Sequence, residues 1–349
     1  MKLLALSALC TAAVSAQAQW VSQASGTDAE FRGLVAVSPT VVWASGTKNR
    51  VARSTDGGRM WKVDTISTGA ALDLRAIAAS SATLAWTLSA GPAEQGQAQI
   101  FRTDDVSHWA KPFETTEKGV FLDALAFWDT QHGIALSDPV AGKLFILATD
   151  DGGRTWARVA ATGATDVLPG EGAFAASGTC LIVQGSANVW IGTGGASRAR
   201  VFRSSDRGRT WSVSDTPMHA GNAASGIFSV AFSDPRHGVA VGGEYSKPKE
   251  AFDNVAVTSD GGQTWRLAHG PLPPGYMSSV TFIPGTSGRS LVAVGLAGTA
   301  TSNDGGESWA MVDTVAYNSV VFVSRTDGWA AGPKGRIAKW APTSGSSRP

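Results

Sequence analysis

Three charged residues that could bind a ligand occupy matching positions in this sequence. Arg32, Arg75 and Asp123 each precede a small residue that is followed by an apolar one. Two neighbouring arginines can hold a carboxylate through paired hydrogen bonds. We therefore expect a polar binding funnel wherever these positions converge, unless the side chains are simply solvated or hydrogen-bond between neighbouring strands. The full set of candidate binding residues is Arg32, Arg75, Asp123, Glu171, Asn222, Tyr276 and Asn318.

The sequence offers little for other kinds of chemistry. Its His, Cys and acidic residues form no cluster with metal-ligand spacing, and the glycine-rich run 192–195 precedes no helix of the kind found in dinucleotide sites. We expect no catalytic residue, metal or cofactor. Because 29 Lys and Arg residues nearly balance 28 Asp and Glu residues, the chain has no basic field for nucleic acid.

An eight-residue motif, which we call the box, recurs along the chain. One copy reads Ser-Thr-Asp-Gly-Gly-Arg-Met-Trp at 54–61, and a degenerate copy at 102–109 keeps the Asp-to-Trp spacing without the glycines. The Asp can accept hydrogen bonds from turn amides, Gly-Gly permits positive φ, and the Trp can wedge between neighbouring units. A calcium loop would need a later bidentate Glu that the boxes lack. The residues predicted to have this structural role are Asp56, Trp61, Asp151, Trp156, Asp206, Trp211, Asp260, Trp265, Asp304 and Trp309.

A second series of motifs fixes the number of units. Short apolar segments that end in a small residue, as at 43–46 and 239–242, occur seven times, against six boxes. The seventh unit stops at 335–340 without an outer strand. Residues 20–22, near the start, resemble those that follow each box. The start of the chain thus supplies the strand that its end lacks, as in a closed ring.

The repeat length then predicts the fold. Each unit is expected to contain four short strands joined by Gly, Asp, Asn and Pro turns, and units of 44 to 55 residues are typical of β-propellers. We predict an all-β, seven-bladed β-propeller of four-stranded antiparallel blades, closed by N- and C-terminal strands that share one blade. The predicted domain spans 19–341, and 342–349 is expected to be a flexible tail. The positions corresponding to Arg32 in the later blades are predicted to be Gly172, Phe228, Ser278 and Asn318.

Alternating strand direction divides the loops between two faces. The boxes and the turns with His132 and His237 fall on one face, the box face, where we expect both histidines to be structural. The longest loops fall on the other, the second face, where binding usually occurs. The loop at 243–253 suits a contact surface, although it could equally be an ordinary exposed turn. The candidate contact residues are Asp138, Arg198, Glu244, Tyr245, Lys247 and Lys249.

Residues 1–18 are typical of a secretory signal peptide. Lys2 is followed by an apolar run over 3–14 and an Ala-x-Ala exit, and the run is shorter than the ~20 residues a membrane helix needs. We expect an exported monomer, periplasmic or secreted, without a membrane span. Signal removal takes Cys10 and leaves Cys180 as a single buried thiol, so no internal disulfide is expected.

The box resembles the Asp-box (BNR) repeat found in sialidases and sortilin-like receptors. The Asp-x-x-His-Gly turns at 129–133 and 234–238 make the sequence most similar to the photosystem II stability/assembly factor family. The resemblance covers 20–340. It implies a propeller that binds a protein partner and assists assembly, as members of that family do in lumenal or periplasmic compartments.

The same repeat leaves an enzymatic alternative open. The resemblance to sialidases would require three arginines, a Tyr nucleophile activated by Glu, and an acidic proton donor. The residues that could take these roles are Arg32, Arg75, Arg198, Tyr276, Glu171 and Asp123. The Arg-Ile-Pro element of sialidases is absent. We therefore expect a non-catalytic, protein-binding assembly or stability factor, with a sialidase-like glycosidase or a glycan-binding propeller as the alternative.

Overall fold

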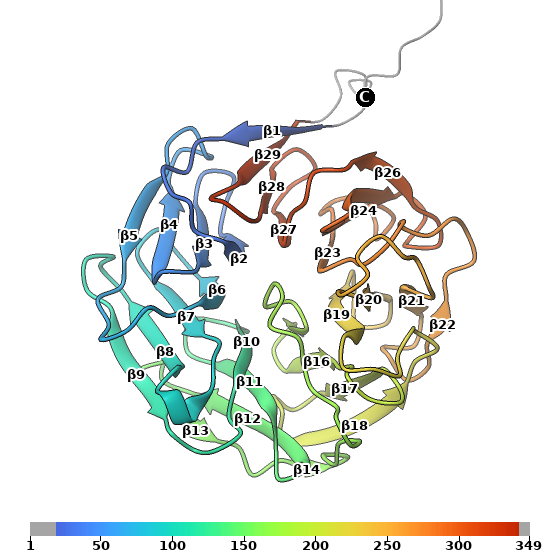
Figure 1. Ribbon diagram of the computed structural model, residues 1–349, viewed down its shortest axis with the longest axis horizontal. Coiled ribbons are helices and arrows are strands. Elements are labelled where there is room, and N and C mark those ends of the chain that lie inside the picture. The colour runs from blue at the N-terminus through green and yellow to red at the C-terminus, as the bar shows by residue number, and fades with distance from the viewer. Residues whose placement is uncertain (1–18, 342–349) are drawn as a thin grey trace, which may run out of the picture.

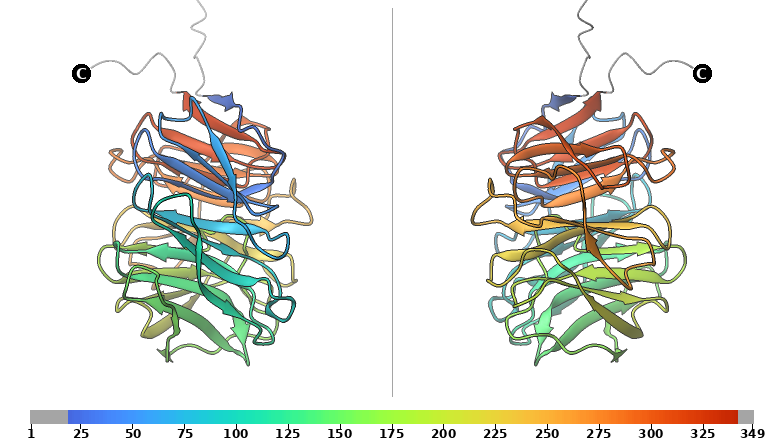
Figure 2. Two further views of the ribbon diagram at one scale, coloured as in Figure 1. Left: turned by 90° about the vertical axis from the view of Figure 1, so that its left-hand side faces the viewer. Right: turned by 90° about the vertical axis from the view of Figure 1, so that its right-hand side faces the viewer.

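The structure, a computed structural model, describes residues 19–341. Within them it is built from β-strands and one short 3₁₀ turn, η1 (Ala93–Gln95). Seven sheets surround a central axis (Figure 1), and Figure 2 shows the ring from its two sides. The all-β, seven-bladed propeller expected from the repeats is confirmed. The predicted signal peptide and tail lie outside the described residues. Nowhere in 19–341 is a helix long and apolar enough to cross a bilayer.

The first four blades follow one another along the chain, each running from the axis outward. Blade 4 carries a short fifth strand, β14 (Thr162–Gly163), parallel to its outermost strand. The strands of blades 1 to 4, blade by blade, are β2 (Phe31–Ala36), β3 (Val42–Gly46), β4 (Arg50–Ser54) and β5 (Lys62–Thr65); β6 (Leu74–Ala79), β7 (Ala85–Ser89), β8 (Ala98–Thr103) and β9 (Ala110–Thr115); β10 (Leu122–Phe127), β11 (Gly133–Val140), β12 (Lys143–Thr149) and β13 (Ala157–Arg158); and β15 (Leu181–Gln184), β16 (Asn188–Gly192), β17 (Arg200–Ser204) and β18 (Thr210–Asp215).

The last three blades repeat the pattern, and the two ends of the chain share blade 7. In that blade β1 (Gln19–Gln23) pairs antiparallel with β29 (Ile337–Ala341), with Trp20 opposite Trp340. The predicted closure of the ring is thereby confirmed. The remaining strands are β19 (Ser225–Phe232), β20 (Gly238–Glu244), β21 (Val255–Thr258) and β22 (Arg266–Leu267); β23 (Ser279–Phe282), β24 (Leu291–Gly295), β25 (Gly298–Ser302) and β26 (Ala310–Asp313); and β27 (Ser319–Phe322) and β28 (Gly328–Ala331).

Each box folds as a tight turn around its carboxylate. Asp151 Oδ1 accepts hydrogen bonds from the amides of Arg154 and Thr155 at 2.9 and 3.0 Å, while the Thr149 hydroxyl accepts one from the Gly153 amide. Gly152 and Gly153 have φ near +74° and +73°, which a residue with a Cβ rarely adopts. The box thus satisfies its own turn amides, as its composition predicts.

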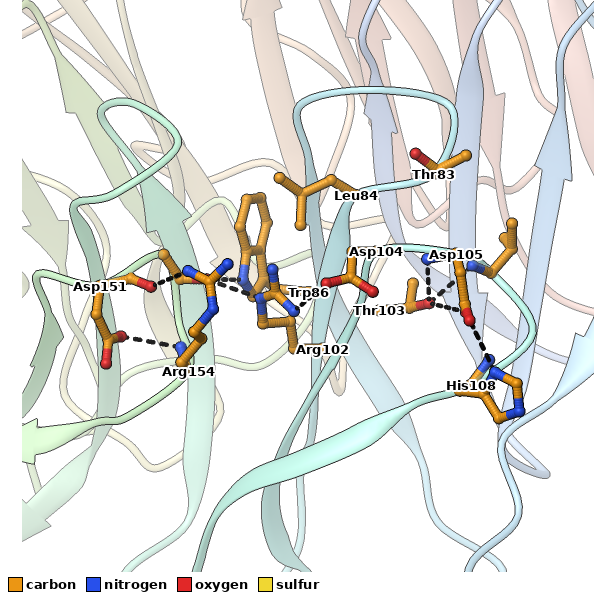
Figure 3. A network of polar contacts seen from close by, with 12 residues as sticks. Thr83, Leu84, Trp86, Arg102, Thr103, Asp104, Asp105, His108, Asp151 and Arg154 are labelled. Atoms are coloured by element: carbon orange, nitrogen blue, oxygen red, sulfur yellow. Dashed lines mark hydrogen bonds and ion pairs between the residues drawn. The ribbon is translucent and has the colours of Figure 1, made fainter.

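Boxes also connect neighbouring blades. The carbonyl of Gly152, in the blade 3 box, accepts hydrogen bonds from Trp86 Nε1 and Arg102 Nε, both on blade 2 (Figure 3). The degenerate box of blade 2 keeps the carboxylate function, because Asp105 accepts the amides of Ser107 and His108. A polar network on the box face therefore joins adjacent sheets.

The box tryptophans fill the space between blades. Trp156 of blade 3 packs with Trp86 and Leu88 of blade 2, and Trp211 of blade 4 packs with Ile134 and Leu136 of blade 3. Trp61, Trp265 and Trp309 occupy the same place at three other blade junctions. These tryptophans lie between neighbouring sheets, and the core consists of apolar clusters between sheets.

Ring closure has one aromatic anchor that can be tested. Trp20 in β1 packs edge-on against Trp340 with ring centroids 4.9 Å apart, and its Nε1 donates to Thr299 of blade 6 at 2.9 Å. We expect Trp20→Ala to lower the free energy of unfolding by about 2 to 3 kcal/mol, somewhat less than for a fully buried Trp because the ring is partly exposed.

Urea unfolding followed by circular dichroism measures this change. Met60→Ala is the control, because Met60 is 74% exposed on the box face and its truncation should cost less than about 0.5 kcal/mol. An unfolding midpoint of Trp20→Ala equal to that of the wild type would contradict the anchoring role.

Candidate functional site

Hydrogen bonds join the innermost strands directly at the axis. The Ser229 hydroxyl accepts from the Val280 amide at 3.0 Å, the Ser279 hydroxyl accepts from the Val320 amide at 3.4 Å, and the Ser319 hydroxyl donates to the Arg32 carbonyl. The inner strands of blades 5, 6, 7 and 1 are linked in this way. Hydrogen bonding between blades, the alternative considered for this region, is therefore present. It involves the residues that directly follow the positions predicted to correspond to Arg32.

One of the positions predicted to correspond to Arg32 is wrong. In blade 4 the innermost strand is β15, and the pairing of Ile182 with Trp190 makes Thr179 the counterpart of Arg32, not Gly172. The sequence alignment failed because blade 4 has extra chain before its first strand. Residues 172–178 form a loop, which we call the plug. In Figure 1 it is the green segment that extends into the centre of the ring.

The plug is held by polar contacts with three different blades. Ser177 Oγ donates to the Ser278 carbonyl at 2.8 Å, and Arg32 Nη1 donates to the Ala176 carbonyl at 3.4 Å. The Ala173 amide donates to Asp138 Oδ1 at 3.2 Å. The central channel is therefore occupied by the chain itself, and the plug contributes to the floor of a pocket on the second face.

This second-face pocket, of about 390 Å³, brings together most of the candidate residues. Five of the seven predicted binding residues and two of the predicted contact residues line it. The complete lining is Arg32, Arg75, Phe121, Asp123, Asp138, Ala173, Phe174, Ala175, Ala176, Phe228, Tyr245, Tyr276, Leu296 and Asn318.

Both arginines of the pocket already have carboxylate partners. Arg32 Nη2 lies 2.6 Å from Glu30 Oε1, and Arg75 Nε lies 2.6 Å from Asp73 Oδ2. Asn318 Nδ2 donates to the Phe31 carbonyl at 2.9 Å. The arginines thus contribute little uncompensated positive charge to the pocket.

Two further carboxyls of the pocket form no ion pair within the described residues. Asp123 is 1% exposed, and its Oδ2 has no hydrogen-bond partner. Burial raises the pKa of Asp123 well above its ordinary value, and the charge of Asp138 raises it further, although Arg75 opposes both effects. Burial also raises the pKa of Asp138 to about 6, against the effect of the hydrogen bond from the Ala173 amide.

An aromatic cluster forms the other side of the pocket. Phe174 of the plug stacks on Phe228 of β19 with ring centroids 3.8 Å apart. Tyr276 packs edge-on against Phe228 at 4.6 Å, and Tyr245 contacts both phenylalanines edge-on at 6.1 and 6.4 Å. The site is therefore half acidic and half aromatic.

The remaining candidates lie outside this pocket. Glu171 forms a buried ion pair with Arg200 and accepts hydrogen bonds from the Thr193 hydroxyl and the Leu168 amide. Asn222 donates to Glu244, which also pairs with Lys247. These contacts organise the blade 4 and blade 5 loops. The two other candidates, Arg198 and Lys249, are exposed, and Arg198 pairs with Asp215.

The sialidase arrangement is not assembled. Glu171 and Arg198 are engaged elsewhere, so they do not join Arg32, Arg75 and Tyr276. Burial raises the pKa of the Tyr276 hydroxyl, which is the opposite of what an activated nucleophile needs. Within 19–341, no group of three or more His, Cys, Asp or Glu side chains is placed to hold a metal ion.

The pocket contains residues that the sequence analysis did not select. Phe174 was missed because the plug was taken for a strand, and Phe228 was recognised as an inner-strand position but not as a binding residue. Leu296 and Phe121 carried no signal beyond being apolar. One signal in the sequence could have identified the plug. The short spacing from Leu181 to Trp190 places the first strand of blade 4 after the plug.

The structure defines a seven-bladed β-propeller with a blind pocket on one face. No family model and no curated protein sequence matches the chain. Among solved structures it is similar to YCF48 bound to a D1 peptide (TM-score 0.64, 16% identity, 93% of this chain and 97% of that one). It is also similar to YCF48 from Cyanidioschyzon merolae (TM-score 0.64, 15% identity, 93% and 99% covered).

A third similar structure is an enzyme. The GH74 xyloglucanase from Xanthomonas campestris matches with a TM-score of 0.60 and 14% identity, over 92% of this chain and 53% of that one. At such identities these likenesses concern the fold.

The half-buried Asp138 predicts an unusual pH dependence of stability. Because its pKa in the folded protein is about 6, above the ordinary 3.8, its contribution is present below pH 3.8 and is lost as pH rises through 6. We expect Asp138→Asn, which can still accept from the Ala173 amide, to be more stable than wild type by roughly 1 to 3 kcal/mol at pH 7 and about equal to it at pH 4.

Urea denaturation at both pH values tests this prediction. Asp150→Asn, at an exposed carboxylate on the box face, is the control and should follow the wild type at both values. A variant that is less stable than wild type at pH 7 would show that the Asp138 carboxylate is stabilised, not strained, in its site.

Proposed function

We propose that this protein is an exported, non-catalytic propeller that holds a segment of a partner protein in the second-face pocket and acts as an assembly or stability factor. The observation that carries the proposal is the pocket itself, which is lined by the plug and by stacked aromatic rings. A cavity of this size on a rigid scaffold suits side chains of an inserted peptide.

The rim of the pocket supports a protein partner. Tyr245 and Leu296 line the pocket and are 49% and 41% exposed, and Phe252, in the same loop as Tyr245, is 50% exposed. Aromatic residues of this kind are enriched in protein interfaces. Two further lines agree with this function. The sequence resembles the photosystem II stability/assembly factor family, and YCF48, a protein of similar fold, has been solved with a bound D1 peptide.

Site-specific photo-cross-linking in the native host tests the proposal. A photoreactive amino acid in place of Tyr245 should give a covalent adduct with a defined polypeptide, which mass spectrometry identifies. The same amino acid in place of Met60, which is even more exposed but lies on the box face, should not. The purified partner should then bind Leu296→Asp at least tenfold more weakly than the wild type. Absence of an adduct at 245, or equal adducts at both positions, would contradict the proposal.

A glycosidase is the second candidate, and one observation favours it. Asp123 and Asp138 line one pocket, burial raises the pKa of each, as it does for the general acid of a glycosidase, and one similar structure is a xyloglucanase. We expect the wild type to release no reducing sugar from xyloglucan and no phenol from aryl glycosides. Turnover by the wild type that Asp123→Asn abolishes would instead establish the enzyme. Binding of these sugars without turnover would indicate a glycan-binding propeller.

A further inference from the structure

The charges that face the second-face pocket are unequal. Arg32 and Arg75 supply two positive charges, and each is matched by its own carboxylate, Glu30 or Asp73. Asp123 and Asp138 then remain as two carboxyls in excess. The other titratable groups in the lining are the hydroxyls of Tyr245 and Tyr276. The pocket is therefore acidic in balance, contrary to what its two arginines suggest in the sequence.

Asp123 lacks the partner that a buried carboxyl needs. Among the described residues its Oδ2 is buried and has no hydrogen-bond partner, which destabilises the folded protein, more so when the carboxyl is charged. One carboxyl oxygen of Asp138 accepts a hydrogen bond from the Ala173 amide. An incoming group that supplies several N–H donors and a positive charge would satisfy both carboxyls, whereas an incoming carboxylate would be repelled by them.

We propose that the group bound in this pocket is a primary ammonium attached to an apolar or aromatic body, with the ammonium on Asp123 and Asp138 and the body against Phe174 and Phe228. This inference rests on the proposed function in one respect, since it assigns the group to the partner protein, which presents it as a lysine side chain or as a chain N-terminus. An aromatic face next to an acidic pair suits such a group, because the ring quadrupole also attracts a cation.

Binding should also release protons. The pKa of Asp138, about 6, leaves this carboxyl partly protonated near pH 6, burial raises the pKa of Asp123 as well, and a bound ammonium favours the ionised forms of both. Calorimetry at pH 6 in two buffers of different ionisation enthalpy measures this release. The positive charges of Arg32 and Arg75 remain matched by their own partners throughout.

Isothermal titration of the whole protein with three probes that share a phenethyl body tests the proposal. We expect phenethylamine to bind at least tenfold more tightly than 2-phenylethanol, and 3-phenylpropionate to bind most weakly. Phenylalaninamide and N-acetyl-lysinamide then distinguish the two sources of ammonium, and the one that binds more tightly identifies the source. Proton release at pH 6 should accompany the binding of phenethylamine.

Charge-removing variants locate the effect. Asp123→Asn and Asp138→Asn should each weaken phenethylamine binding at least tenfold and leave 2-phenylethanol unchanged, while the control Asp150→Asn changes neither. If Asp123→Asn fails to fold, Asp138→Asn alone decides. Equal or tighter binding of 3-phenylpropionate, or amine binding unaffected by the Asp138 variant, would overturn the proposal.

This result is separable from the test of the proposed function. Amine preference without a cross-link at position 245 would support the ammonium site and contradict the proposal of a protein partner. A cross-link at 245 without amine preference would support the partner and overturn the ammonium site.

Discussion

The pairing of β1 with β29 is the constraint on which the ring depends, because it makes the two ends of the chain into one blade. With that blade in place, the inner strands β27 and β2 lie side by side and Ser319 can donate to the Arg32 carbonyl. The same junction sets Asn318 beside Phe31. One side of the pocket is thus built from residues almost 300 positions apart, and it exists only when the ring is closed.

A ring of seven blades leaves a channel at its axis, and this protein fills the channel with its own chain. The plug turns an open tube into a blind pocket and brings Phe174 onto Phe228. It also fixes Asp138 through the Ala173 amide. The propeller provides the frame, but the extra chain before β15 makes the site, which explains why fold similarity alone does not determine what is bound.

The sequence predicted the features that follow a local rule. The boxes and their tryptophans indicated turns and blade junctions. The Asp accepts turn amides and the Trp packs between sheets, and these two roles require a fixed spacing between Asp and Trp. The inner-strand position that corresponds to Arg32 was predicted in six blades. The prediction was wrong at Gly172, because an insertion shifts the start of that strand to Leu181. The ion pair of Arg32 with Glu30 joins residues only two apart in the sequence, but it was not predicted. The unpaired Oδ2 of the buried Asp123 was not predicted either, since it depends on which described side chains of other blades converge.

The most direct measurement of the account is a crystal structure of the protein grown with phenethylamine. The account predicts the ammonium nitrogen within hydrogen-bond distance of Asp123 Oδ2 and of Asp138, with the ring against the Phe174–Phe228 pair and both arginines still on Glu30 and Asp73. An empty pocket in which Arg75 has turned to Asp123, or a ligand whose ammonium faces solvent, would contradict it.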